Sequence, residues 1–175
     1  ALDLIGMLRQ QYPLNDWISM LYSPLSLFDR LPISFRVDAE IRLREAGQFT
    51  YDLRDFLNVV MPNSSEDNSE HTGLILRPLI MARDSRVFAE ATNQDFSSWA
   101  QVFKSVLNDL GWPGNRTLDS VEYQQREHWD RLLEAFSELD NLSIQVGFNS
   151  ALKQLRQLAH DSVFHPQTAD APLQV

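Results

Sequence analysis

Apolar residues recur at helical spacing through the second half of this chain, and this periodicity constrains the fold more than any other feature. The runs lie within residues 96–110, 129–139 and 148–159. Spacings of three and four residues place such side chains on one face of an α-helix. Strand-like alternation is absent until residues 172–175. The sequence therefore predicts an all-α domain of about seven or eight helices.

The second half of the chain contains residues that are typical of helix ends. Gly111, followed by Pro113, predicts the end of the first helical run, because glycine accepts the positive φ that often closes a helix. Asp119 and Glu122 have the spacing of a capping box, which predicts a helix that starts at this point. The last helix is expected over residues 148–159.

The first half predicts shorter helices. One is expected near residues 4–8 and a second after Asn15, which we interpret as its N-cap. A third is predicted over residues 36–46 from Val37, Ile41 and Leu43, with Gly47 as its stop. A fourth is expected over residues 53–60.

Residues 62–73 differ from the rest in composition. They contain three acidic residues, no basic residue and no large apolar group. Such a segment cannot offset the entropy of ordering, so we predict a mobile loop. Pro78 suits the first turn of a further helix through residues 79–88. The expected organisation is one helical domain over residues 1–165 with this loop, and a tail over residues 166–175.

Composition and charge exclude several classes of protein. The chain has 175 residues, 43% of them hydrophobic, which is sufficient for one core. It has no cysteine, so disulfide frameworks and thiolate chemistry are ruled out. No stretch reaches the roughly 20 apolar residues that a bilayer requires, and we expect a cytoplasmic protein with no membrane contact. The formal net charge of −9 argues against a free-standing nucleic-acid-binding domain.

Motifs for catalysis and cofactor binding are absent or weak. The six glycines are scattered, and the four histidines form no HExxH pair, so we expect no cofactor. Asp161 and His165 are four residues apart and could face one another on a helix, in a metal-binding or acid/base role. A helix-end ion pair is the preferred interpretation of these two residues. Asp130, Glu134 and Glu138 could line a cation site. A solvated outer helix face explains these three acids more simply.

Two groups of arginines are candidates for phosphate contacts. Arg83 and Arg86 share a helix face with few competing acids, and they could touch DNA as part of a larger surface. The arginines of the third helix are the other group: Arg36, Arg42 and Arg44. The simpler interpretation of each arginine is surface solubility and local pairing with nearby acids.

One stretch of the chain carries a distinctive sequence motif. Residues 110–124 read LGWPGNRTLDSVEYQ, and they are followed by Trp129, Leu132-Leu133, Leu139-Asp140, Ala151-Leu152 and Leu155. These features resemble bacterial probable DNA repair proteins related to AddB and RecB. Such proteins combine a superfamily-1 helicase-like body with a C-terminal PD-(D/E)XK nuclease. The start of the chain also fits, with Trp17, Ser23-Pro24-Leu25 and Leu43-Arg44.

The resemblance implies an internal helical domain, equivalent in position to the 2B insertion of UvrD-like helicases, whose tail leads to a strand of the next domain. The family's ATP-site and nuclease residues match no position here, so the fragment itself is expected to be non-catalytic. Expected partners are the other domains of the parent chain, DNA, or a partner helicase–nuclease subunit. An alternative is a helical module that docks a partner subunit without touching DNA.

The resemblance also implies roles for the turn. Gly111 would close the preceding helix, and Trp112 and Pro113 would pack the turn. Gly114 would allow a close backbone approach before the Asp119 cap. Arg116 would tie the turn to a neighbouring helix or contact a DNA phosphate.

Overall fold

Most of the helices predicted from apolar spacing are present in the computed structural model, which describes residues 1–61, 76–82, 93–114 and 117–162, so the helix predicted through 79–88 is described only to residue 82. Its elements, in chain order, are α1 (Leu2–Gly6), β1 (Tyr12–Pro13), α2 (Leu14–Tyr22), η1 (Leu27–Arg30), α3 (Ile33–Glu45), β2 (Thr50–Tyr51), α4 (Leu53–Val60), α6 (Phe96–Asp109), α7 (Ser120–Ser137), η3 (Glu138–Leu142) and α8 (Phe148–Asp161). Residues 76–82 are also helical. In the described part, only β1–β2 and one isolated bridge interrupt this pattern, which confirms the all-α fold.

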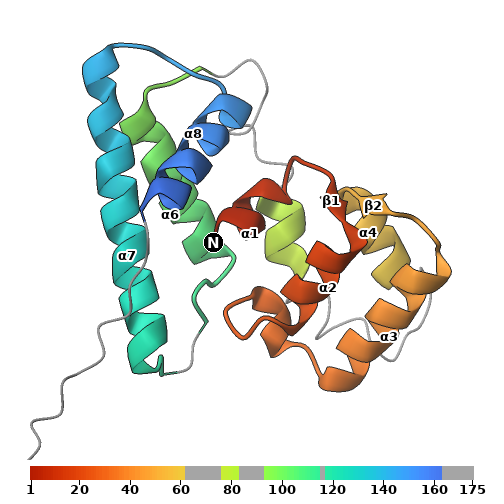
Figure 1. Ribbon diagram of the computed structural model, residues 1–175. Helices are drawn as coiled ribbons and strands as arrows, with labels where there is room; N and C mark the ends of the chain where they lie inside the picture. The colour runs from red at the N-terminus through yellow and green to blue at the C-terminus, as the bar shows by residue number, and fades with distance from the viewer. Residues whose placement is uncertain (62–75, 83–92, 115–116, 163–175) are drawn as a thin grey trace, which may run out of the picture.

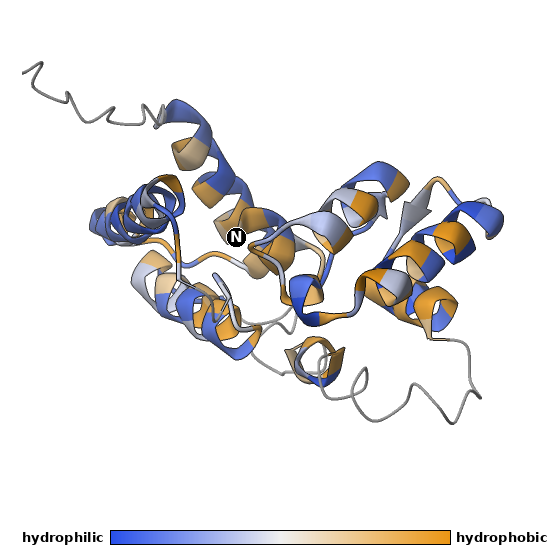
Figure 2. Cartoon of the chain, turned by 90° about the horizontal axis from the view of Figure 1, so that it is seen from below, coloured by the Kyte–Doolittle hydropathy of each residue, from blue (hydrophilic) through white to orange (hydrophobic). Residues whose placement is uncertain are grey.

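Most of the described helices fall into two groups (Figure 1). Figure 1 shows α2, α3 and α4 together on one side and α6, α7 and α8 on the other, with α1 between them. α1 contacts both α6 and α8, and the buried side chains of the two groups belong to one continuous hydrophobic core. Figure 2 shows hydrophobic and hydrophilic residues sharing these helices, as expected of helices that each bury one face.

Aromatic rings and two polar tethers hold the first group together. The rings of Trp17 and Phe56 stack with their centroids 4.0 Å apart, and Phe28 meets Phe56 edge-on at 5.6 Å. The Trp17 indole donates a hydrogen bond to the Tyr51 carbonyl at 3.0 Å. The Tyr51 hydroxyl donates to the Leu43 carbonyl at 2.6 Å. These bonds satisfy the polar atoms of two buried aromatic residues and connect α2, β2 and α3.

The second group has its own aromatic centre. Trp99 and Phe103 of α6 stack at 5.6 Å, and both rings meet Phe148 of α8 nearly edge-on. Phe136 of α7 packs near Phe103 at 6.2 Å. The Trp99 indole donates to the Val146 carbonyl at 2.8 Å, so this buried donor is also satisfied.

Carboxylates cap the N-termini of α6 and α7. The capping box predicted at the start of α7 is confirmed, with Asp119 and Glu122 bonding each other's backbone amides. At α6, Asp95 accepts from the Ser98 amide at 2.8 Å. Asp140, which follows α7 in sequence, also reaches α6 and accepts from the Phe96 amide at 2.7 Å. This last bond fastens the end of α7 to the start of α6.

A polar cluster connects the segment after α1 to α8. Arg156 hydrogen-bonds the Tyr12 hydroxyl and donates to the Gln10 side chain at 3.0 Å. Gln10 in turn donates to Asn149 at 3.2 Å. Burial raises the pKa of Tyr12 to about 12. A Cβ at Gly6 would lie 2.0 Å from the Tyr12 hydroxyl, so only glycine leaves room for this cluster.

The structure corrects several expectations in the first half. α2 begins at Leu14 with Pro13 at its N-cap, so Asn15 lies inside the helix and does not cap it. α3 begins at Ile33, ahead of the predicted start at residue 36. The antiparallel pair β1–β2 was not expected, because two residues per strand show no alternation. The predicted loop at 62–73 and the tail from 166 lie outside the described residues.

Replacing Phe56 should cost much of the stability of the first group. Phe56 is fully buried against two aromatic rings, so Phe56→Ala should lower the free energy of unfolding by about 3–5 kcal/mol. The matched control is Phe49→Ala, because the Phe49 side chain is 91% exposed, and we expect a change within about 0.5 kcal/mol. Urea denaturation of both variants measures the difference. Similar losses in the two variants would contradict the packing described here.

The cap of α6 should make stability depend on pH. Hydrogen bonds from the Ser98 side chain and amide hold the pKa of Asp95 below its ordinary value of 3.8. A lowered folded-state pKa gives stability that is complete above 3.8 and is lost as the pH falls through the folded value. Wild type should therefore lose more stability than Asp95→Asn between pH 7 and acid, as measured by urea denaturation. Asp38→Asn, which alters an exposed acid elsewhere, is the control; an identical loss in wild type and Asp95→Asn would refute the role of this cap.

Candidate functional site

The turn Gly111–Gly114 ends α6 as the sequence predicted. Gly111 has a φ of +73°. Its amide donates to the Asn108 carbonyl at 2.8 Å, and the Trp112 amide donates to the Leu107 carbonyl at 2.8 Å. These two bonds form a Schellman motif, which satisfies the last carbonyls of the helix. The predicted role of Gly111 in closing α6 is confirmed.

Arg30 of η1 tethers this turn to the first group of helices. Its guanidinium donates to the Gly111 carbonyl at 3.2 Å, across 81 positions of sequence. A Cβ at Gly111 would lie 2.1 Å from the Arg30 Nη2 atom, so the absence of a side chain lets the guanidinium approach. Arg30 thus ties the turn to η1. Arg116, for which a tie to a neighbouring helix or a phosphate contact was expected, lies outside the described residues, so its role stays a prediction.

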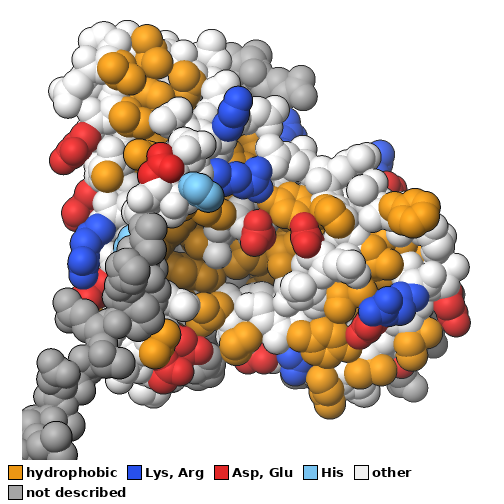
Figure 3. All heavy atoms as spheres, viewed as in Figure 1, with side chains coloured by type: hydrophobic (Ala, Val, Ile, Leu, Met, Phe, Trp, Pro, Cys, Tyr) orange, Lys and Arg blue, Asp and Glu red, His pale blue; other side chains and the backbone are white. Residues whose placement is uncertain are grey.

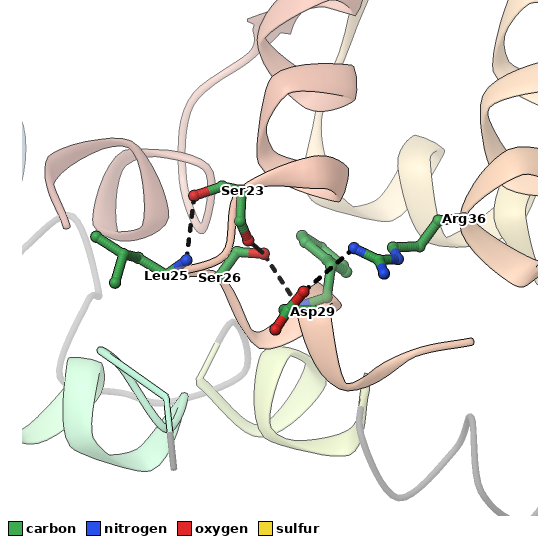
Figure 4. Close-up of polar contacts among 6 residues, drawn as sticks. Ser23, Leu25, Ser26, Asp29 and Arg36 are labelled. Atoms are coloured by element: carbon green, nitrogen blue, oxygen red, sulfur yellow. Dashed lines mark hydrogen bonds and ion pairs between the residues drawn. The ribbon is translucent and has the colours of Figure 1, made fainter. Parts of the chain in front are cut away.

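η1 is held in place by short-range polar contacts, shown in Figure 4. Ser26 caps η1 by accepting from the Phe28 amide at 3.2 Å, and its hydroxyl donates to the Ser23 carbonyl at 3.0 Å. Asp29 accepts from the Arg36 guanidinium of α3 at 3.3 Å. These contacts fix the short helix that presents Arg30 to the turn.

The remaining turn residues have separate roles. Trp112 is partly buried and meets Trp129 of α7 nearly edge-on, with centroids 6.0 Å apart, so Trp112 packs the turn as expected. Gly114 has a φ of +103°, and among the described residues a Cβ there would come no nearer than 4.0 Å to another atom, the Pro24 carbonyl oxygen. Backbone conformation, and not the close approach we expected, is therefore the requirement for glycine at this position.

The predicted DNA contacts are only partly visible. Arg83, Arg86 and Arg116 lie outside the described residues, so their role stays a prediction. The arginines of α3 are engaged locally. Arg42 donates to the Val60 carbonyl at 3.0 Å, and Arg44 donates twice to Glu40 at 2.8 and 2.9 Å. Pairing of this kind was the simpler interpretation of these residues.

The acidic residues singled out on α7 and α8 are also paired locally. Asp130 lies 3.7 Å from the Lys104 ammonium of α6. Asp161 accepts from Gln157 at 3.1 Å and contacts His160 at 3.4 Å, whereas His165 lies outside the described residues. In the described portion of the chain, no three His, Asp or Glu side chains are grouped to hold a metal ion.

An apolar stripe on the exposed face of α3 was not expected from the sequence. Ile33, Val37 and Ile41 are 58%, 42% and 47% exposed, and two of them, Val37 and Ile41, belong to the apolar spacing that predicted this helix. The buried residues of α3 are Ala39 and Leu43. Figure 3 shows hydrophobic side chains on the surface over α3, at the lower right. We call Ile33, Val37 and Ile41 the α3 stripe.

A hydrogen-bonded network borders the α3 stripe. Tyr22, at the end of α2, donates to Glu40 at 2.8 Å, and its ring lies 6.0 Å from the Arg36 guanidinium carbon. Hydrogen bonds from Arg44 and Tyr22 lower the pKa of Glu40. Partial burial and the hydrogen bond to Glu40 raise the pKa of Tyr22. The network therefore favours the ionised form of Glu40 and the protonated form of Tyr22.

Comparison with protein-family models, with curated proteins and with solved structures found no match for this chain. None of the described helices combines the length and the apolar character needed to cross a bilayer.

The Arg30 tether can be tested with two glycines of similar conformation. Gly111→Ala and Gly47→Ala each place a Cβ at positive φ, at a cost of about 1–2 kcal/mol. Only Gly111→Ala should also displace Arg30, because a Cβ at Gly47 would meet the described residues no nearer than 4.0 Å, at the Glu45 carbonyl oxygen. We expect an additional loss of about 0.5–1.5 kcal/mol in urea denaturation, the typical value of one hydrogen bond. In an Arg30→Ala background the two glycine variants should become equivalent; a difference that persists there would exclude the tether as its cause.

Proposed function

We propose that this chain is a non-catalytic helical accessory domain that works by binding another protein segment. The α3 stripe is the observation that carries this proposal. Three branched apolar side chains on one exposed face contribute little to the core, and exposed apolar groups that cluster are typical of protein-binding surfaces. A helix face of this kind can receive a partner without rearrangement of the fold.

The charges of the described residues support protein binding over DNA binding. The arginines nearest the α3 stripe are already engaged: Arg36 with Asp29, and Arg44 with Glu40. The formal net charge of −9 opposes approach to a phosphate backbone. A role as a brace or docking module fits these features.

The parent assembly we propose is a DNA-repair helicase–nuclease similar to AddB and RecB, located in the cytoplasm. This part of the proposal rests on the resemblance of residues 110–124 and the associated positions. The Schellman motif at Gly111 gives a structural reason for the sequence motif at residues 110–124 on which the resemblance rests. Within such an assembly the segment that binds the α3 stripe would belong to another domain of the parent chain or to a partner subunit.

DNA titration tests this proposal against direct DNA contact. The fragment should give no salt-sensitive anisotropy change with labelled single-stranded or forked DNA, at low or near-physiological salt, because its net charge repels phosphates. The double variant Arg83→Glu/Arg86→Glu should behave in the same way. Binding by wild type that this variant loses, and that Arg131→Glu retains, would establish a DNA-contact domain instead. Arg131 is the control because its side chain is 72% exposed and pairs with Glu127 of the same helix.

A further inference from the structure

The α3 stripe has the geometry of a ridge for helix packing. Its members lie at positions i, i+4 and i+8 and span about 12 Å at 1.5 Å per residue. Ridges of side chains four residues apart fit the grooves of a second helix, which is the commonest way in which helices pack. The occupant that matches this surface is therefore another helix with apolar residues at the same spacing.

The two borders of the α3 stripe differ in charge. At 100° per residue, Glu40 lies on one side of the stripe, and Asp38 and Glu45 lie on the other. Arg44 neutralises Glu40. Asp38 and Glu45 are exposed, and neither carboxylate forms an ion pair or hydrogen bond with the residues that the structure describes. One border is thus balanced. The other carries two carboxylates without a partner among the described residues, next to Arg42, whose guanidinium donates to the Val60 carbonyl.

We propose that α3 docks an amphipathic helix that carries an apolar i, i+4, i+8 ridge and lysine or arginine residues along one flank. This inference rests on the proposed function and specifies the partner for it. The basic flank would lie against Asp38 and Glu45, where attraction fixes orientation and excludes acidic competitors.

A second copy of this chain fits the surface less well. In an antiparallel pair related by a two-fold axis, each flank of α3 faces the same flank of its partner. Asp38 and Glu45 would then face their own copies, and like charges that meet across an interface are unfavourable. The net charge of −9 on each copy adds to this repulsion.

Designed peptides test the inference directly. Two labelled helical peptides of about 20 residues carry the same leucine ridge, one with a lysine flank and one with a glutamate flank. At low salt the lysine peptide should bind wild type about tenfold more tightly than the glutamate peptide, by fluorescence anisotropy. Val37→Asp should weaken its binding about tenfold or more, because it places a charge in the ridge.

Charge reversal at the acidic border provides a variant that cannot disturb the core. Asp38→Lys/Glu45→Lys should reverse the preference, so that the glutamate peptide binds more tightly. The control is Val121→Asp, which places the same charge at an exposed valine of α7, 46% exposed, and should leave both affinities unchanged. Circular dichroism and thermal unfolding confirm that each variant is folded.

Several results would overturn the inference. One is that wild type binds neither peptide. Another is that both peptides bind with equal affinity to wild type and to Asp38→Lys/Glu45→Lys. A third is that Val121→Asp weakens peptide binding more than Val37→Asp does. Self-association in sedimentation that Val37→Asp abolishes would show that a second copy covers α3. The DNA titration distinguishes failure of this inference from failure of the proposed function. If the chain binds neither peptide nor DNA, only the helical partner is contradicted. If it binds DNA and Arg83→Glu/Arg86→Glu abolishes that binding, the proposed function itself is contradicted.

Discussion

The orientation of α3 depends on the buried aromatic residues Trp17 and Tyr51. Trp17 stacks on Phe56 and donates to the Tyr51 carbonyl, and Tyr51 donates to the Leu43 carbonyl. A buried donor that loses its partner costs about 1–3 kcal/mol, so these bonds specify one arrangement among those that bury similar apolar area. Because Leu43 is held inward, the opposite face of α3 is directed to solvent. The exposure of the α3 stripe is thus a consequence of the hydrogen bonds that the buried Trp17 and Tyr51 side chains form in the core.

The two groups of helices are joined by polar contacts between residues far apart in sequence. Arg30 reaches the turn at Gly111, and Arg156 reaches Tyr12 and Gln10. Both arrangements require a glycine, because a Cβ at Gly111 or at Gly6 would overlap the polar group that approaches it. Guanidinium groups suit this purpose, since they offer several donors in a fixed plane and tolerate partial exposure. The relative placement of the groups therefore depends on directional bonds as well as on the shared apolar core.

The sequence allowed much of the fold to be predicted where the signal is local. Helical spacing located α4, α6, α7 and α8, and the Asp119 and Gly111 signals were correct because a cap or a turn involves neighbours in the chain. Predictions failed where the outcome depends on distant residues. α3 carries apolar residues on two faces, and only packing against α2 and α4 decides that Ala39 and Leu43 are buried. The β1–β2 pair and the Arg30 tether join residues tens of positions apart, so no local pattern announces them.

An apolar ridge on its own would be an indiscriminate surface, since burial of apolar area has no preferred direction. The borders of the α3 stripe change this. Glu40 is already bound by Arg44 and Tyr22, so a partner that covers that side gains little from adding a charge there. Asp38 and Glu45 have no such partner in the described structure, and an apolar or acidic helix that covered them would remove their hydration without replacement. A basic flank supplies that replacement, and at the rim of an interface it acts mainly on association rate and orientation. The ridge thus provides the affinity, and the carboxylates of Asp38 and Glu45 determine which helices can use it.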